Sequence, residues 1–315
     1  MTAVDTFYAG KDEAKLKLFA NYLLSKVYVV FVRTNSFRSA YRLFNVLNTR
    51  GLPLSNADLI KNALFDKLTN GEDYSQEFED RWIELEETVA IDILDTFLGH
   101  HRTSIKAEKA REDLFKEFDP IIKAEAKDPF LFVDKLIISA RNFRRINESK
   151  FKEPQAIPSI NALHRVRYDE WIAPLLCFLN RPVSDMSEIE FLQLLEKITM
   201  QNWIRRLGRT ARLTVYFQLI SAINDDKSAD DLRSVFRANA NNKEFLTLLK
   251  SDIYGLPRAQ AILLRLEEAS QDESVTKVFG GDISIEHILP QEFLDLSFGP
   301  CRSHSGTVLR YSRGG

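Results

Sequence analysis

The chain reads EFEDRWIELEETVAIDILDTFL from Glu77 to Leu98. Apolar side chains recur along this stretch at helical period, and charged residues fill the positions between them. The apolar positions are Trp82, Leu85, Val89 and Leu94. This spacing is typical of an α-helix that buries one face and leaves the other in water. We therefore expect a helix over 77–98 that packs into a helical core.

The same pattern recurs through most of the chain. It predicts further helices over residues 16–24, 39–48, 56–67, 107–118, 129–147, 169–180, 187–201, 203–223, 230–238, 243–249 and 257–268. Strands are predicted only at 27–32 and in the segment 283–291, which contains a histidine. The expected fold class is mostly α: a multi-helix domain with small β elements near the N-terminus and at the C-terminal His-containing strand.

Composition bounds the class of protein. With 315 residues, 44% of them hydrophobic and 28% charged, the chain is long enough for two domains with real cores. Two cysteines imply no disulfide framework, and the apolar run at 27–32 is too short to cross a bilayer. A cytoplasmic protein outside the membrane is expected. A net charge of −2 means that nucleic acid would be bound only by local basic patches.

The segment 283–291, ISIEHILPQ, places Glu286 directly beside His287. A histidine with a pKa of ~6.5 can take a proton from water, and a neighbouring carboxylate can hold a divalent metal beside the same phosphate. Consecutive strand side chains point to opposite faces, so the two residues share a centre only where the strand bends or ends. Pro290 is suited to such an ending. The alternative is an ordinary half-buried histidine between Ile285 and Ile288.

A second informative stretch, residues 39–65, reads SAYRLFNVLNTRGLPLSNADLIKNALF. It predicts two helices and a tight joint, with Gly51 in the left-handed conformation that ends the first helix. Ser55 followed by Asp58 resembles a capping box at the start of the second helix, which would bury Leu59 and Leu64. Without further information this is also an ordinary helical hairpin.

Both stretches resemble the GmrSD-like restriction endonucleases. Residues 286–290 match the E-H-I-x-P form of their HNH (His-Me finger) domain, and F-x-x-L-N-x-R-G-x-x-L-S-x-x-D-L-I-K-x-x-L-F at 44–65 resembles the latter part of their ParB-like domain. The resemblance implies His287 as general base, Glu286 as ligand of a divalent metal such as Mg²⁺, and DNA, including modified DNA, as substrate. It divides the chain into the end of a ParB-like domain at 1–75, a helical domain at 76–272, and an incomplete nuclease motif with an irregular tail at 273–315.

Several family features are missing from this chain. It has neither the D-G-Q-Q-R motif associated with nucleotide hydrolysis nor a phosphate-binding loop, so no nucleotide cofactor is expected. An HNH site also needs an asparagine after the histidine, and no asparagine follows Asn242. His304 is the remaining candidate for a second metal ligand. We therefore expect a truncated or frameshifted fragment whose nuclease centre is incomplete.

The stretch 203–212, WIRRLGRTAR, is the main candidate for binding nucleic acid. A helix there would place Arg205, Arg209 and Arg212 on one face, with Arg206 beside them, where guanidinium groups bind backbone phosphates. Arginines at this spacing also occur on solvated faces, paired with acids.

Two functions are therefore open. The first is metal-dependent phosphodiester hydrolysis in a DNA-cleaving defence system. The alternative is a catalytically inactive helical module that binds DNA, a partner subunit or a second copy of the chain. The neighbouring His100 and His101 lack the carboxylate or cysteine spacing of a metal site and are expected at the surface.

Overall fold

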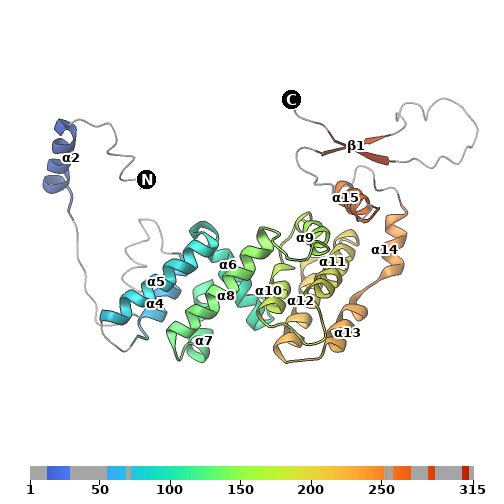
Figure 1. Cartoon of the computed structure of the whole chain (residues 1–315), viewed down its shortest axis with the longest axis horizontal. Coiled ribbons are helices and arrows are strands. Elements are labelled where there is room, and N and C mark those ends of the chain that lie inside the picture. The colour runs from blue at the N-terminus through green and yellow to red at the C-terminus, as the bar shows by residue number, and fades with distance from the viewer. Residues whose placement is uncertain are drawn as a thin grey trace, which may run out of the picture. The chain divides into compact units, whose positions relative to one another are not determined.

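The computed structural model describes residues 13–28, 55–68, 72–251, 253, 258–270, 283–287 and 307–311. Most of these residues are helical, so the expectation of a mostly α protein is confirmed (Figure 1). The chain divides into two compact units, residues 1–53 and 54–315. In the first unit the described part is the helix α2 (Glu13–Lys26), which covers the helix predicted at 16–24, and then Val27 and Tyr28 without regular structure.

The second unit contains the remaining elements. They are α4 (Asn56–Phe65), α5 (Glu72–Val89), the 3₁₀ turn η1 (Ile91–Ile93), α6 (Leu94–Lys106), α7 (Leu114–Glu125), α8 (Pro129–Asn147), α9 (Ala156–His164), α10 (Ile172–Asn180), α11 (Glu188–Ile204), α12 (Arg209–Asn224), α13 (Ala229–Asn239), α14 (Asn242–Leu249), α15 (Ala259–Ser270), β1 (Ile283–His287) and β2 (Thr307–Tyr311).

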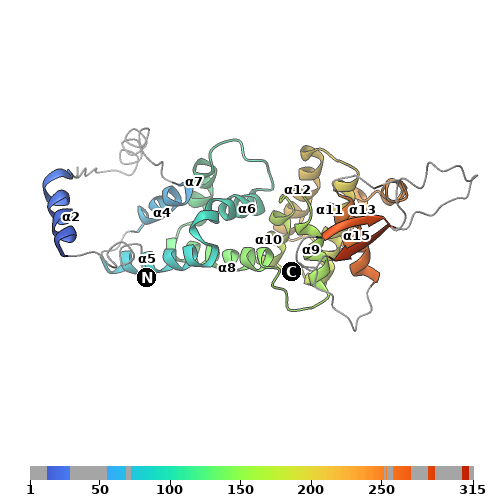
Figure 2. The same ribbon diagram turned by 90° about the horizontal axis from the view of Figure 1, so that it is seen from above.

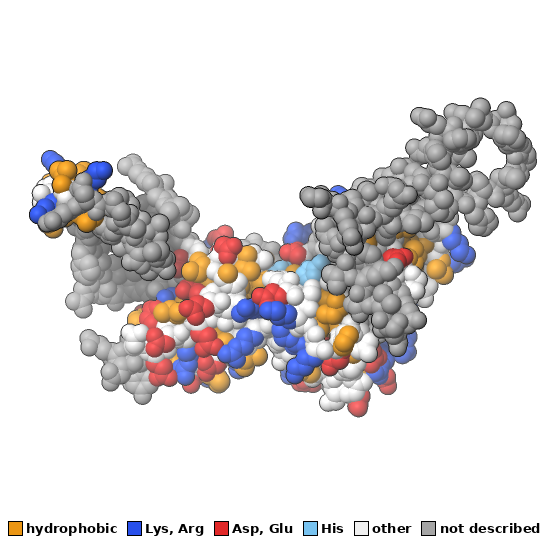
Figure 3. All heavy atoms as spheres, turned by 45° about the horizontal axis from the view of Figure 1, so that its top comes forward, with side chains coloured by type: hydrophobic (Ala, Val, Ile, Leu, Met, Phe, Trp, Pro, Cys, Tyr) orange, Lys and Arg blue, Asp and Glu red, His pale blue; other side chains and the backbone are white. Residues whose placement is uncertain are grey.

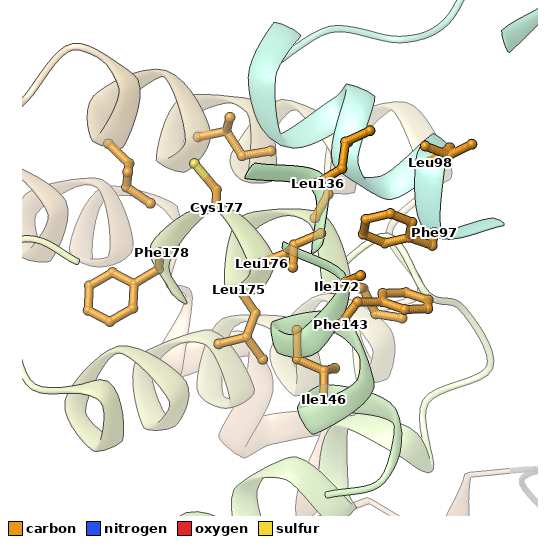
Figure 4. Close-up of a cluster of buried hydrophobic side chains, with 14 of the residues drawn as sticks. Phe97, Leu98, Leu136, Phe143, Ile146, Ile172, Leu175, Leu176, Cys177 and Phe178 are labelled. Carbon is orange, nitrogen blue, oxygen red and sulfur yellow. The ribbon is translucent and has the colours of Figure 1, made fainter. Parts of the chain in front are cut away.

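The helix α10 lies at the centre of the core. Its sequence IAPLLCFLN is apolar on every side, which is typical of a helix surrounded by others. It packs against α6, α8, α11 and α12. Leu175 and Leu176 lie among side chains from α6 and α8, including Phe97 and Phe143 (Figure 4). Because α10 is apolar on every side, the neighbouring helices can pack around it.

The capping box predicted at the start of α4 is confirmed. The Ser55 hydroxyl accepts a hydrogen bond from the Asp58 backbone N–H at 3.1 Å, and the Asp58 carboxylate accepts one from the Ser55 backbone N–H at 3.1 Å. Asp95 of α6 accepts further bonds from the backbone N–H groups of Asn56 and Ala57, at 3.2 and 2.9 Å. Since α4 also packs on α7, it belongs to the same core as the helices that follow (Figure 2). The domain boundary expected at residue 75 rests on the family resemblance and remains a prediction.

The single helix predicted over 77–98 is wrong. The run breaks at Ala90, whose φ of 75° lies outside the helical region, and the 3₁₀ turn η1 leads from there into α6. Leu94, Phe97 and Leu98 are buried on α6. The break gives α6 its own direction and brings Asp95 to the first turn of α4, a contact that sequence periodicity does not register.

Two other predicted helices are misplaced. The helix at 107–118 starts only at Leu114, because Ala107 takes the left-handed conformation that ends α6. The helix at 203–223 is interrupted between α11 and α12 at Arg205–Gly208. The helix α9 was not predicted; Pro158 in its third position is tolerated because a first-turn residue needs no N–H partner within the helix.

The C-terminal strands are described by their backbone. β1 and β2 pair antiparallel, with Ile283 opposite Tyr311 and His287 opposite Thr307. The helix predicted at 39–48, its end at Gly51 and most of the strand predicted at 27–32 lie outside the described residues. Among the described helices, none combines the length and the hydropathy needed to span a bilayer.

Candidate binding site

The four arginines of the candidate nucleic-acid segment do not share one helix face. Arg205 ends α11, Arg206 follows it with a φ of 59°, and Arg209 and Arg212 lie in α12. The turn is fixed by the bond from the Leu207 backbone N–H to the carbonyl of Asn202, at 2.9 Å, which is the arrangement that commonly ends a helix at a left-handed residue. The predicted i, i+4, i+7 face is therefore wrong.

Three of the four guanidinium groups are paired with acids. Arg205 lies 2.5 Å from Glu244, while Arg209 and Arg212 share one oxygen of Glu170 at 3.3 and 2.9 Å. Arg206 is exposed, and no acid is paired with it among the residues that the structure describes. On the face drawn in Figure 3, basic and acidic side chains are interspersed over the described helices. This agrees with the ordinary interpretation of such arginines, as partners of neighbouring acids.

Arg212 is held by three kinds of contact. Its guanidinium lies over the ring of Tyr168, 3.8 Å from the ring centre, and it donates to the Leu207 carbonyl at 2.8 Å as well as to Glu170. The Tyr168 hydroxyl donates to the carbonyl of Thr199 at 3.1 Å. Burial raises the pKa of Tyr168 well above its usual value, so its ring carries no charge at neutral pH. Arg212 is therefore a structural cation, with little freedom to bind a phosphate.

A pocket of about 230 Å³ opens between α6, α10 and α12, beside this cluster. Its lining includes His100, Asp169, Glu170, Arg209 and Tyr216. The ring nitrogen Nε2 of His100 lies 3.3 Å from the carboxylate of Asp169, and the hydrogen bond from His100 lowers the pKa of that carboxyl. Burial raises the pKa of Tyr216 to about 12. The lining of the pocket thus carries charges of both signs, two carboxylates and one guanidinium, beside the His100 ring.

Glu170 is the most unusual group in this pocket. Its side chain is only 10% exposed, and one oxygen, Oε1, accepts a hydrogen bond from Arg212 and forms an ion pair with Arg209. The other oxygen, Oε2, is buried and has no hydrogen-bond partner among the described residues. A buried carboxylate oxygen without a donor is costly, so this is a position where a bound donor would be stabilised. The sequence does not predict this site, because Glu170, between Asp169 and Trp171, belongs to no recognisable motif.

The two histidines expected at the surface are not there. His100 and His101 lie inside α6, where the side chain of His100 is 12% exposed and His101 is 8% exposed. The prediction failed because α8 packs its Phe143 and Ser139 against them.

The backbone positions of Glu286 and His287 are the last two of β1. His304 and Pro290 lie outside the described residues, and so do the contacts of the Glu286 and His287 side chains. Within the described side chains, no group of three His, Cys, Asp or Glu residues is placed to hold a metal ion.

Comparison with known proteins yields no match: no family model, no curated protein and no solved structure is significantly similar to this chain.

Proposed function

We propose that the chain belongs to the GmrSD-like restriction endonucleases and hydrolyses phosphodiester bonds in DNA, including modified DNA, with a nuclease centre that is incomplete and therefore impaired. His287 acts as the general base, and Glu286 supplies a hard oxygen ligand for Mg²⁺ or a similar cation. The small β elements of the expected fold belong to this proposal, with β1 as the strand that carries the catalytic pair. The D-L-I-K segment of α4, with its capping box, supports the second resemblance.

The observation that carries the proposal is the position of the pair within β1. His287 is the last residue of the strand, opposite Thr307 of β2. Neighbouring side chains of a regular strand point apart, but at its end the backbone can turn and bring them to one centre. Mg²⁺, when bound, would neutralise charge on the phosphate. One carboxylate does not fix such an ion, and the asparagine that an HNH site needs is missing after His287, which is why the centre is expected to be impaired.

The test is DNA cleavage by the full chain with and without Mg²⁺. We expect metal-dependent cleavage that is lost in His287→Ala and reduced in Glu286→Gln. Ser284→Ala, on the same strand, is the matched control and should cleave like the parent protein. If there is no metal-dependent cleavage, or if His287→Ala retains it, then the chain is not a nuclease of this kind.

The second candidate is a helical module that binds DNA, a partner subunit or another copy of the chain without cleaving anything. It is favoured by Arg206 and by Arg209, whose side chain is 66% exposed beside the Glu170 pocket. If both arginines contact phosphates, then the double substitution to glutamine should reduce the slope of log affinity against log salt by about two. The control removes the same charge at Arg141 and Arg144, which are exposed on α8, and should leave the slope unchanged. Equal slopes in both variants would exclude these arginines as the DNA contact.

A further inference from the structure

A second pocket, of about 330 Å³, lies on the other side of α6 from the Glu170 pocket. Residues of α6, α8, α10 and α12 line it, together with Glu125 at the end of α7. Phe132, Ile138, Cys177 and Ile105 give it apolar walls. Its volume is at the lower end of the range for small-molecule sites in proteins. A ligand that fits would therefore be small and largely apolar.

One of the polar groups that line this pocket is the ring of His101. The ring is 8% exposed, and its Nδ1 atom lies 2.8 Å from the hydroxyl oxygen of Ser139. That hydroxyl oxygen accepts a hydrogen bond from the amide of Asn180 at 2.8 Å, and Asn180 in turn accepts one from Asn142 at 3.0 Å. Since the Ser139 oxygen already accepts from Asn180, its hydroxyl proton can be donated to Nδ1 of His101.

This chain of hydrogen bonds accommodates the tautomer of His101 in which Nδ1 accepts from Ser139. If Nδ1 accepts, then the proton of the neutral ring is on Nε2. Nε2 has no hydrogen-bond partner among the described residues, although the residue lines the pocket. Burial keeps the ring neutral at pH 7 by lowering its pKa to about 4. In this tautomer the pocket contains an oriented N–H donor that no group in the described part of the chain uses.

The charges at the pocket are predominantly basic. Lys135 is exposed on α8 and has no ion-pair partner in the described part of the chain. Arg181 follows α10, donating to Asp226 at 2.8 Å and to the carbonyl of Asn224 at 3.3 Å. Glu125 is the one acid among the lining residues. A ligand that carries a negative charge close to Lys135 is therefore favoured over a cation.

We propose that this pocket binds a small organic carboxylate, with its apolar body between Phe132 and Ile138, its carboxylate accepting the Nε2–H of His101, and Lys135 completing the charge. The site is independent of Glu286 and His287, and it is distinct from the Glu170 pocket. Cys177 contributes only its volume, since burial raises the pKa of its thiol to about 12.

The experiment uses the full chain and benzoate as the probe, with binding measured by calorimetry. We expect benzoate to bind, and benzylamine, which has a similar body and the opposite charge, to bind at least tenfold more weakly. Equal binding of the two probes would overturn the proposed role of charge.

Variants then locate the site. Ile138→Trp adds bulk where a side chain that is 54% exposed lines the pocket, and it should abolish benzoate binding. Leu131→Trp is the matched control: it lies seven residues earlier on α8, is also 54% exposed, does not line the pocket, and should bind benzoate as the parent does. Lys135→Gln should weaken binding on the order of fivefold, and His101→Phe on the order of tenfold through loss of the donor. If His101→Phe fails to fold, Ile138→Trp and Lys135→Gln still decide. Binding that survives Ile138→Trp would overturn the proposal.

Discussion

At the residue scale, His101 illustrates how packing determines the chemistry of a side chain. Its ring lies against Phe97 and Phe118, with ring centres 5.8 and 6.4 Å away, and among the described residues only one ring nitrogen has a hydrogen-bond partner. Water solvates an imidazolium far better than these aromatic rings do, so burial lowers the pKa of His101 from 6.5 to about 4. The folded state therefore holds this ring neutral where the unfolded chain would protonate it.

This shift predicts how stability depends on pH. Between pH 6.5 and pH 4 the unfolded chain binds a proton at His101 and the folded chain does not, so the free energy of unfolding falls as the pH falls through this window. Between pH 7 and pH 5 the loss from this group should be roughly 2 kcal/mol. In His101→Phe, urea unfolding at the two pH values should show a smaller decrease by about that amount. A variant whose stability falls as steeply as that of the parent would contradict the assignment.

The sequence predicts residue-level features only where they are local. The capping box of Ser55 and Asp58 is fixed by a spacing of three residues, and it was predicted correctly. The burial of His101 depends on Ser139, 38 residues away, and the environment of Glu170, which precedes α10, depends on arginines of α12 that pair with one of its oxygens and leave the other without a partner among the described residues. Periodicity carries no information about such partners, so both features were missed.

Among the elements, the connection between α6 and α7 is held by the buried side chain of Arg102, which pairs with Glu117 and Glu108. The Arg102 side chain, 1% exposed, donates from Nε to Glu117 at 3.0 Å and also reaches the carbonyl of Glu108. Glu117 accepts from the backbone N–H groups of Arg111 and Glu112 at 2.7 and 3.0 Å. The bonds from Arg111 and Glu112, together with Arg102, lower the pKa of Glu117. The Glu117 carboxylate thus accepts from the backbone N–H groups of Arg111 and Glu112 in place of helical carbonyl groups, although the composition of this stretch is typical of a helix.

Removing the Glu117 carboxylate should destabilise the folded protein. In Glu117→Ala the buried guanidinium of Arg102 loses its closest carboxylate and keeps only Glu108, whose carboxylate lies 3.4 Å away, and the free energy of unfolding should fall by about 3 kcal/mol. The control is Glu112→Ala, whose side chain is 60% exposed, and it should change stability by less than about 0.5 kcal/mol. Urea denaturation of both variants measures the difference. Equal effects would mean that the Arg102–Glu117 pair does not hold this connection.

The same contacts explain which helix boundaries were predictable. The helix predicted at 129–147 agrees with α8 at both ends, because Asp128 caps it and Pro129 suits its first position. The prediction of 107–118 failed because the local pattern is helical while Arg102 and Glu117 hold the first part in another conformation. Capping residues next to a helix end therefore predict that end correctly. The sequence pattern does not reveal ion pairs between residues far apart in the chain.

At the scale of the whole molecule, one buried apolar cluster runs through the second unit. It extends from Ala57 in α4 to Phe236 in α13 without interruption. The sequence resemblance assigns α4 to a different domain from the helices after residue 75, yet its side chains pack into their core. A domain boundary drawn from a family resemblance need not coincide with a boundary between hydrophobic cores. Burial depends on which apolar faces contact each other, whatever family segment they come from.

This continuity predicts that helices α4 to α13 unfold together. Leu64 in α4 and Leu219 in α12 are fully buried, and each change to alanine should lower the free energy of unfolding by about 3 kcal/mol. Both should shift one common urea transition, followed by helical circular dichroism and by the fluorescence of Trp82 and Trp171, which are buried in different parts of the cluster. Leu131→Ala, at a position that is 54% exposed, should leave that transition nearly unchanged. A Leu64→Ala protein with two separate transitions, only one of them shifted, would show that α4 belongs to an independent folding unit.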